Sequence, residues 1–261
     1  MNFPLAKRVA SHLEWRAEVE SSNTLLTNLS REDSAQWPDR SVIVADFQSS
    51  GKGRSGRQWL APAGSSLMVS VLLRPAVQGL AIERYTWFPL LAGLAATRTV
   101  NHFGLHGQLK WPNDVQVGGK KIAGILSELS EESVVIGLGL NLRQRPDQLP
   151  ITEATSFAIE GIPNVSTDAV LTIYLSELFN LYQQFLDADG DAETSGLRAQ
   201  ASEACSTIGQ RVAASLPSGE KLSGVASALD PTGALLVRAE PNFELVSVAA
   251  GDIVHLRVEP A

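Results

Sequence analysis

A glycine-rich basic loop occupies residues 49–59, and a strand follows it where the common nucleotide-binding folds would need a helix. Gly51, Gly53 and Gly56 have the spacing of a dinucleotide-binding fingerprint, but that fingerprint opens a helix. Here a turn-forming segment leads into the apolar run 67–73, which reads as a strand. The loop also lacks the Gly-Lys-Ser/Thr ending of a Walker A loop. The sequence therefore predicts neither of these two folds.

The charge of this loop is opposite to that of the whole chain. The 261 residues carry a formal net charge of −7, yet the segment 47–82 contains no Asp or Glu. Its cations are Lys52, Arg54, Arg57 and Arg74. Glycines let backbone N–H groups turn toward a ligand, and guanidinium groups fit phosphate or carboxylate. The loop is therefore predicted to bind an anion, although spacing alone leaves a solvated basic loop as an alternative.

Four further stretches accompany the loop. Glu-Ser-Ser-Asn-Thr stands at 20–24, Lys-Trp-Pro-Asn-Asp at 110–114, Gly-Gly-Lys-Lys-Ile-Ala-Gly-Ile-Leu at 118–126 and Gly-Leu-Gly-Leu-Asn at 137–141. In this order they resemble the biotin protein ligases, the enzymes that attach biotin to carboxylases. The resemblance covers residues 21–141 and continues more weakly into the C-terminal segment. The chain departs from the family at Lys52, which keeps the charge of the usual Arg but lacks its planar fork.

The hydrophobic pattern predicts an α+β core followed by a small all-β unit. The first forty residues are predicted to be helical, with a first core helix at 21–29. Further helices are predicted at 80–103, from 166 and up to Cys205, and strands at 41–47, 67–73, 105–109, 115–117, 121–129 and 134–140. From residue 208, five short runs separated by turns predict a small β-barrel. The resemblance implies a core with a mixed sheet, related to class II aminoacyl-tRNA synthetases, over 1–206, and an SH3-like β-barrel over 207–261.

The resemblance also implies a two-step reaction and the residues that carry it. Biotin and ATP would form biotinyl-5'-AMP, and a lysine of a carrier domain would then attack this mixed anhydride. Lys110 and Arg54 are the candidate catalytic residues, since a cation between carboxylate and α-phosphate lowers their repulsion. The candidate substrate-binding residues are Ser21, Ser22, Asn23, Gln48, Gly51, Lys52, Gly53, Arg54, Trp59, Lys110 and Asn141. Mg²⁺ is expected with ATP, with its protein ligands left open.

The resemblance also implies which part of the substrates each group would contact. The loop N–H groups and cations would hold the α-phosphate and the biotin carboxylate. The segment 21–23 and Gln48 would supply hydrogen bonds to the ureido ring. Trp59 would pack on the adenine or on the apolar face of biotin, and Asn141 would face the ribose.

Composition also bears on the compartment and the partners that we expect for this chain. The single cysteine, Cys205, excludes an intramolecular disulfide and fits a reducing cytoplasm; it is expected to be a small core residue. No apolar run is long enough to span a membrane, and the acidic balance argues against nucleic acid. The expected partner is the biotin carboxyl carrier domain of acyl-CoA carboxylases, with monomer or homodimer left open.

Two alternative functions compete with this interpretation. One is a lipoate or octanoate ligase or transferase, which shares the core. The other is a biotin-responsive transcriptional repressor. We expect no DNA binding, because only twenty residues precede Ser21 and no helix-turn-helix fits there.

Overall fold

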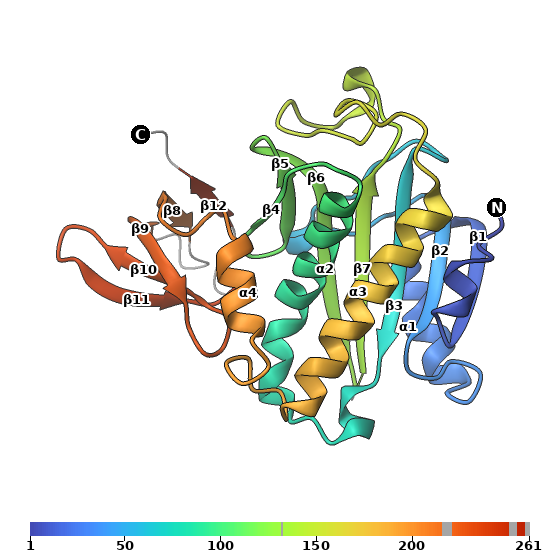
Figure 1. Cartoon of the computed structure of the whole chain (residues 1–261), viewed down its shortest axis with the longest axis horizontal. Coiled ribbons are helices and arrows are strands. Elements are labelled where there is room, and N and C mark those ends of the chain that lie inside the picture. The colour runs from blue at the N-terminus through green and yellow to red at the C-terminus, as the bar shows by residue number, and fades with distance from the viewer. Residues whose placement is uncertain (132, 216–220, 251–254, 259–261) are drawn as a thin grey trace.

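Two β-sheets organise the chain, and the computed structural model describes residues 1–131, 133–215, 221–250 and 255–258 (Figure 1). The larger sheet is mixed and has the strand order β1-β2-β3-β7-β6-β5-β4. Its strands are β1 (His12–Val19), β2 (Ser41–Gln48), β3 (Ser66–Leu73), β4 (Gly107–Lys110), β5 (Asp114–Val117), β6 (Lys120–Ser130) and β7 (Ser133–Asn141). The α-helices are α1 (Ser22–Glu32), α2 (Phe88–His102), α3 (Thr167–Asp187) and α4 (Leu197–Ala204). The mixed α+β core is as predicted.

The helices cover the two faces of the larger sheet unequally. Val42 and Val44 of β2 point into the main core, which they share with α2 and α3. Ile43, between them, points to the other face and packs with Leu26 of α1 in a smaller cluster. The short helix α1 covers only part of that second face. The uncovered part, beside the first turn of α1, is where the chain has room for a ligand.

Local signals set the ends of the helices much as predicted. Ser21 caps α1, since its hydroxyl accepts a hydrogen bond from Thr24 N at 3.5 Å. Ser166 caps α3 through Ala169 N at 3.3 Å. The glycine pair 118–119 has positive φ at both residues and forms the turn between β5 and β6.

The prediction of a helical entry was wrong. Residues 12–19 form strand β1, which pairs in parallel with β2 at the edge of the sheet. Leu13 and Trp15 pack against the main core, and the alternate positions Glu14 and Arg16 form an ion pair outside it. This period-two alternation is the signal for a half-buried strand. The helix predicted over 80–103 is also shorter, because a 3₁₀-helix, η4 (Ile82–Trp87), precedes α2.

The C-terminal unit is a second, antiparallel sheet with the order β11-β10-β9-β8-β12. Its strands are β8 (Arg211–Ser215), β9 (Lys221–Leu229), β10 (Leu235–Ala239), β11 (Glu244–Val248) and β12 (His255–Val258). The sheet is consistent with the predicted SH3-like β-barrel, although among the described residues no pairing joins the edge strands β11 and β12 to close it. Parts of the predicted barrel, 216–220, 251–254 and 259–261, lie outside the described residues.

The connection between the two sheets passes close to β4. Cys205 follows α4 and is 6% exposed, as predicted for a small core residue. Its backbone forms a parallel bridge with Leu109 of β4, and Ser206 N donates to Leu109 O at 2.8 Å. The start of the C-terminal unit is thus bonded directly to the strand that ends at Lys110.

Candidate active site

A cavity of about 560 Å³ opens on the α1 side of the larger sheet. The loop between β2 and β3 and the segment 150–154 line it, together with strands β4 to β7 and the first turn of α1. Ten of the eleven candidate binding residues line this cavity: Ser21, Ser22, Asn23, Gln48, Lys52, Gly53, Arg54, Trp59, Lys110 and Asn141. Gly51 does not line it; its carbonyl accepts from Trp59 N at 2.9 Å and forms the base of the loop.

One row of paired residues runs across the floor of this cavity. Lys110 of β4 is paired with Asp114 of β5, which is paired with Gly124 of β6. Gly124 is paired in turn with Gly139 of β7, and Gly139 with Met68 of β3. Directly opposed residues of a sheet point to the same face. The Lys110 and Asp114 side chains therefore lie beside a strip of floor that has no side chains.

The glycines of the floor allow close approach from above. A Cβ at Gly139 would overlap the indole of Trp59, and one at Gly124 would lie 3.2 Å from the same ring. A Cβ at Gly137 would lie 2.6 Å from Asn23 Oδ1. Trp59 thus lies flat against the sheet, and the start of α1 sits tightly beside it.

A network of polar side chains is buried at the α1 end of the cavity. Gln48 Oε1 accepts from Ser22 N at 2.7 Å and from Ser22 Oγ at 3.0 Å. Ser70, which is fully buried, bonds Ser22 Oγ at 2.8 Å and Asn23 Oδ1 at 2.5 Å. Asn23 Nδ2 then donates to Glu128 Oε2 at 2.8 Å. Such a network fixes the direction of each donor and acceptor, which suits recognition of a compact, neutral polar ring.

Cations outnumber carboxylates in the lining of the cavity. Two carboxylates, Asp114 and Glu153, line the cavity against five cations: Lys52, Arg54, Arg57, Lys110 and Lys121. Among the described residues, neither Lys52 nor Lys110 has a side-chain hydrogen bond or ion pair. A chain of net charge −7 therefore gathers an excess of positive charge here, as an anion-binding site requires.

Arg54 is the most constrained of the loop cations. Its guanidinium donates to Asn113 Oδ1 at 3.2 Å and to the carbonyl of Ala250 in the C-terminal unit. Burial lowers the pKa of Arg54, the charge of Arg57 lowers it further, and the charge of Asp114 opposes both effects. An anion bound beside it would relieve this unfavourable environment.

Lys121 is a site residue that the sequence-based prediction missed. Its Nζ forms an ion pair with Asp114 Oδ1 at 2.6 Å and lies 5.8 Å from the centroid of the Trp59 ring. Nζ is also 3.0 Å from the Cβ position of Gly124, so it lies directly on the floor. The Gly-Gly-Lys-Lys stretch was the available signal, but only the register of β6 shows which lysine faces the cavity. Ser70 and Glu128 were missed for the same reason.

Asn141 lines the cavity with an amide that is already engaged. Its Nδ2 donates to Thr155 O and its Oδ1 accepts from Gln144 Nε2, both at 2.9 Å. The side chain is 5% exposed. Asn141 therefore helps to hold the cavity wall in place, and its amide keeps a second N–H and a second oxygen lone pair, so the contact with the ribose stays a prediction.

A divalent cation would find few protein ligands here. Among the described residues, no group of three His, Cys, Asp or Glu side chains is arranged to hold a metal. The cavity carboxylates are Asp114, which is paired with Lys121, and Glu153. This donor set fits Mg²⁺, which commonly uses one or two carboxylates plus substrate phosphates and water.

Comparison with known proteins decides the family. A family model described as the biotin/lipoate A/B protein ligase family matches residues 16–141, and the biotin protein ligase C terminal domain matches residues 207–256. The biotin--[acetyl-CoA-carboxylase] ligase of Mycobacterium tuberculosis is 35% identical over 245 residues, which cover 92% of this chain and 88% of that protein. The chain belongs to the biotin protein ligases.

Other members of the family agree with this assignment. The bifunctional ligase/repressor BirA of Bacillus subtilis is 35% identical over 119 residues, but the match covers only 36% of that protein. The biotin protein ligase of Aquifex aeolicus in complex with biotin and ATP superposes with a TM-score of 0.78 at 26% identity, over 95% of this chain and all of that one. Within the described part of this ligase chain, no helix is both long and apolar enough to cross a membrane.

Proposed function

We propose that the chain couples biotin to ATP to form biotinyl-5'-AMP and transfers the biotinyl group to a lysine of a biotin carboxyl carrier domain. The observation that carries this proposal is one cavity that combines two kinds of lining. The cavity offers a buried polar network around Gln48, and five cations also line it. One substrate with a neutral polar ring and a carboxylate, next to one triphosphate, fits this division.

In the first step a biotin carboxylate oxygen bonds the α-phosphorus of ATP, the bond from this phosphorus to the bridging oxygen breaks, and pyrophosphate leaves. Two anions must come together, so the protein's part is to position them and offset their charge. We assign this to Lys110, Lys121 and Arg54. Asp114 holds Lys121 in place, and Lys52 adds charge at the loop.

Biotin would lie along the glycine floor. Its ureido ring would reach the network of Ser22, Asn23 and Gln48, with Ser21 fixing the start of α1. Its apolar part would pack against the side of the Trp59 indole, whose ring lies on the floor over Gly139. Gly53, whose N–H donates to Arg57 O at 2.6 Å, would hold the loop in shape around the anion. Asn141 supports the wall.

ATP would bring Mg²⁺, which neutralises phosphate charge when it is bound. Asp114 and Glu153 are the residues that would hold it, and the phosphates would supply the remaining ligands. Lys110, Lys121 and Arg54 would remain beside the α-phosphate and offset part of its charge. The proposal therefore requires no further protein ligands for the metal.

In the second step the acceptor lysine amine attacks the carbonyl carbon of the mixed anhydride and AMP leaves. The acceptor would be a biotin carboxyl carrier domain of an acyl-CoA carboxylase, since the Mycobacterium tuberculosis relative is named for that partner. The single buried cysteine fits the reducing cytoplasm where we place the reaction.

A lipoate ligase is the second candidate, because the matched family includes lipoate ligases. The biotin protein ligase C-terminal domain over 207–256 favours biotin. The test is ATP-dependent transfer of labelled biotin to a purified carrier domain, with lipoate and a lipoyl domain as the control pair. We expect transfer of biotin alone. Transfer of lipoate at an equal or greater rate would refute the assignment.

We expect the loop from Gly51 to Trp59 to be cut by trypsin in the free protein and protected by biotinyl-AMP. The loop offers cleavage sites at Lys52, Arg54 and Arg57, and its glycines lose much conformational entropy on ordering. An anion that binds these cations would order the loop and shield the anhydride from water. Cleavage is followed by mass spectrometry with and without ligand, and equal cleavage rates would contradict this coupling.

A further inference from the structure

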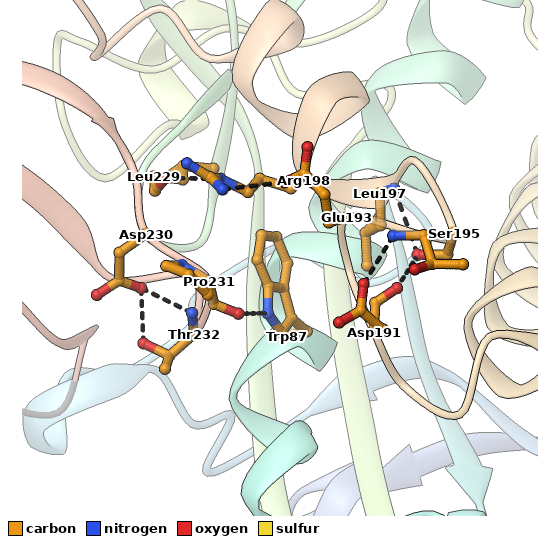
Figure 2. Close-up of polar contacts among 11 residues, drawn as sticks. Trp87, Asp191, Glu193, Ser195, Leu197, Arg198, Leu229, Asp230, Pro231 and Thr232 are labelled. Carbon is orange, nitrogen blue, oxygen red and sulfur yellow. Dashed lines mark hydrogen bonds and ion pairs between the residues drawn. The ribbon is translucent and has the colours of Figure 1, made fainter.

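A turn of the C-terminal unit reaches the larger domain next to the active site. This turn, 230–233, joins β9 to β10. The indole Nε1 of Trp87 donates to Pro231 O at 2.9 Å (Figure 2). Thr86 Oγ1 donates to Thr232 O at 2.8 Å. The indole Nε1 of Trp111 donates to Gly233 O at 3.1 Å. Two buried tryptophans of the larger domain are therefore held by main-chain carbonyls of this turn.

Asp230 gives the turn its shape. Its Oδ1 accepts from Thr232 N at 2.8 Å, from Thr232 Oγ1 at 2.7 Å and from Ala234 N at 3.1 Å. Its Oδ2 accepts from Ser247 Oγ of β11 at 2.7 Å. Burial would raise the pKa of Asp230, but the hydrogen bonds from Thr232, Ser247 and Ala234 outweigh it and leave the pKa below its usual value. The carboxylate is thus charged, and it fixes the directions of the turn carbonyls.

Trp111 connects this turn to the cavity. It follows Lys110 directly and is 1% exposed. Its main-chain N donates to Thr207 Oγ1 at 3.1 Å, so a second group at the start of the C-terminal unit also holds it. The short segment from Trp111 to Asn113 links the paired residues Lys110 and Asp114 at the edge of the cavity. A shift of the Trp111 indole would therefore move both charged groups.

We propose that Asp230 is a positioning residue for adenylate formation: it fixes the turn whose Gly233 carbonyl holds Trp111, and so places Lys110 and Asp114 in the cavity. This inference rests on the proposed function. The same C-terminal unit also contacts the site directly, because Arg54 donates a hydrogen bond to the carbonyl of Ala250. None of the Asp230 contacts reaches the α1 end of the cavity, where Ser22 and Gln48 lie.

The test separates adenylation from biotin binding. Asp230→Ala is expected to lower the single-turnover rate of biotinyl-AMP formation by about 10- to 100-fold, because small misplacements of catalytic groups cost that much. The biotin Kd, measured by calorimetry, is expected to stay within about twofold of the original, because binding and catalytic losses are separable. Asp230→Asn keeps an acceptor at the Oδ1 position and is expected to restore most of the rate.

Asp191→Ala is the matched control. Asp191 also shapes a turn by accepting from Thr194 N at 2.7 Å, but its hydrogen bonds do not reach Trp111. We expect a near-normal adenylation rate in this variant. Equal losses in Asp191→Ala and Asp230→Ala, or a parallel loss of biotin affinity, would overturn the proposal.

A further variant covers the case in which Asp230→Ala does not fold. Thr232→Val removes one hydrogen bond to Asp230 and is expected to show a smaller loss of the same kind. A folded Thr232→Val with an unchanged adenylation rate would then count against the proposal. Failure of the original protein to form biotinyl-AMP would instead refute the proposed function.

Discussion

Lys121→Ala is expected to lower the single-turnover rate of biotinyl-AMP formation by about 100- to 1,000-fold, the usual cost of losing a group that stabilises transition-state charge. The Lys121 ammonium lies on the glycine floor and is fixed by Asp114 at 2.6 Å. In the proposed reaction it would lie beside the carboxylate and the α-phosphate. Rapid-quench measurement of labelled biotinyl-AMP gives the rate, and calorimetry gives the biotin Kd, which should change far less.

Two further lysines make this experiment specific. Lys120 is exposed and does not line the cavity, so Lys120→Ala should leave the rate nearly unchanged. Lys110→Ala should also slow adenylation much more than it weakens biotin binding, since Lys110 is paired with Asp114 at the edge of the same floor. Near-normal adenylation in Lys121→Ala would remove Lys121 from the mechanism, and the same result in Lys110→Ala would remove Lys110.

Gly139→Ala is expected to weaken biotin binding by about 10- to 100-fold while the chain stays folded, since losing a packed aromatic contact costs a few kcal/mol. The added methyl group would overlap the Trp59 indole and lift it from the floor. Gly139 lies in β7 and is not among the glycines with positive φ. Alanine is therefore compatible with the strand backbone. The biotin Kd and the melting temperature report the two parts of this prediction.

A double-mutant cycle tests whether this effect acts through Trp59. In Trp59→Ala the indole is gone, so adding Gly139→Ala should cost little further biotin affinity. The two single variants should therefore be strongly non-additive. Full additivity would mean that the methyl group blocks biotin itself or distorts β7, and would contradict the proposed packing of Trp59 on Gly139.

Local patterns predicted much of the core. The caps Ser21 and Ser166 and most of the strands could be found from the sequence because their signals lie within a few residues. The edge strand β1 carried the same kind of signal in the alternation of Leu13 and Trp15 with charged residues. It was missed because the segment was read as a helical entry.

The site was predicted in outline and not in its details. The basic loop carried its signal in its composition, and the segment 110–114 carried it in the resemblance to the biotin protein ligases. The role of Lys121 and that of Ser70, a polar residue within an apolar strand, depend on strand register. Register is set by pairing between distant segments. The contact of Trp111 with Gly233 spans more than a hundred residues and has no local signal.

Local opening of the junction between the two units can be measured through the reactivity of a natural cysteine. Cys205 is the only cysteine of the chain, and its backbone pairs with Leu109, next to Lys110. A thiol reagent reaches such a buried sulfur only through local opening, so its reaction rate reports the free energy of that opening. The chain thus carries a native chemical reporter at the joint between its catalytic strand and its C-terminal unit, and no engineered label is needed to read it.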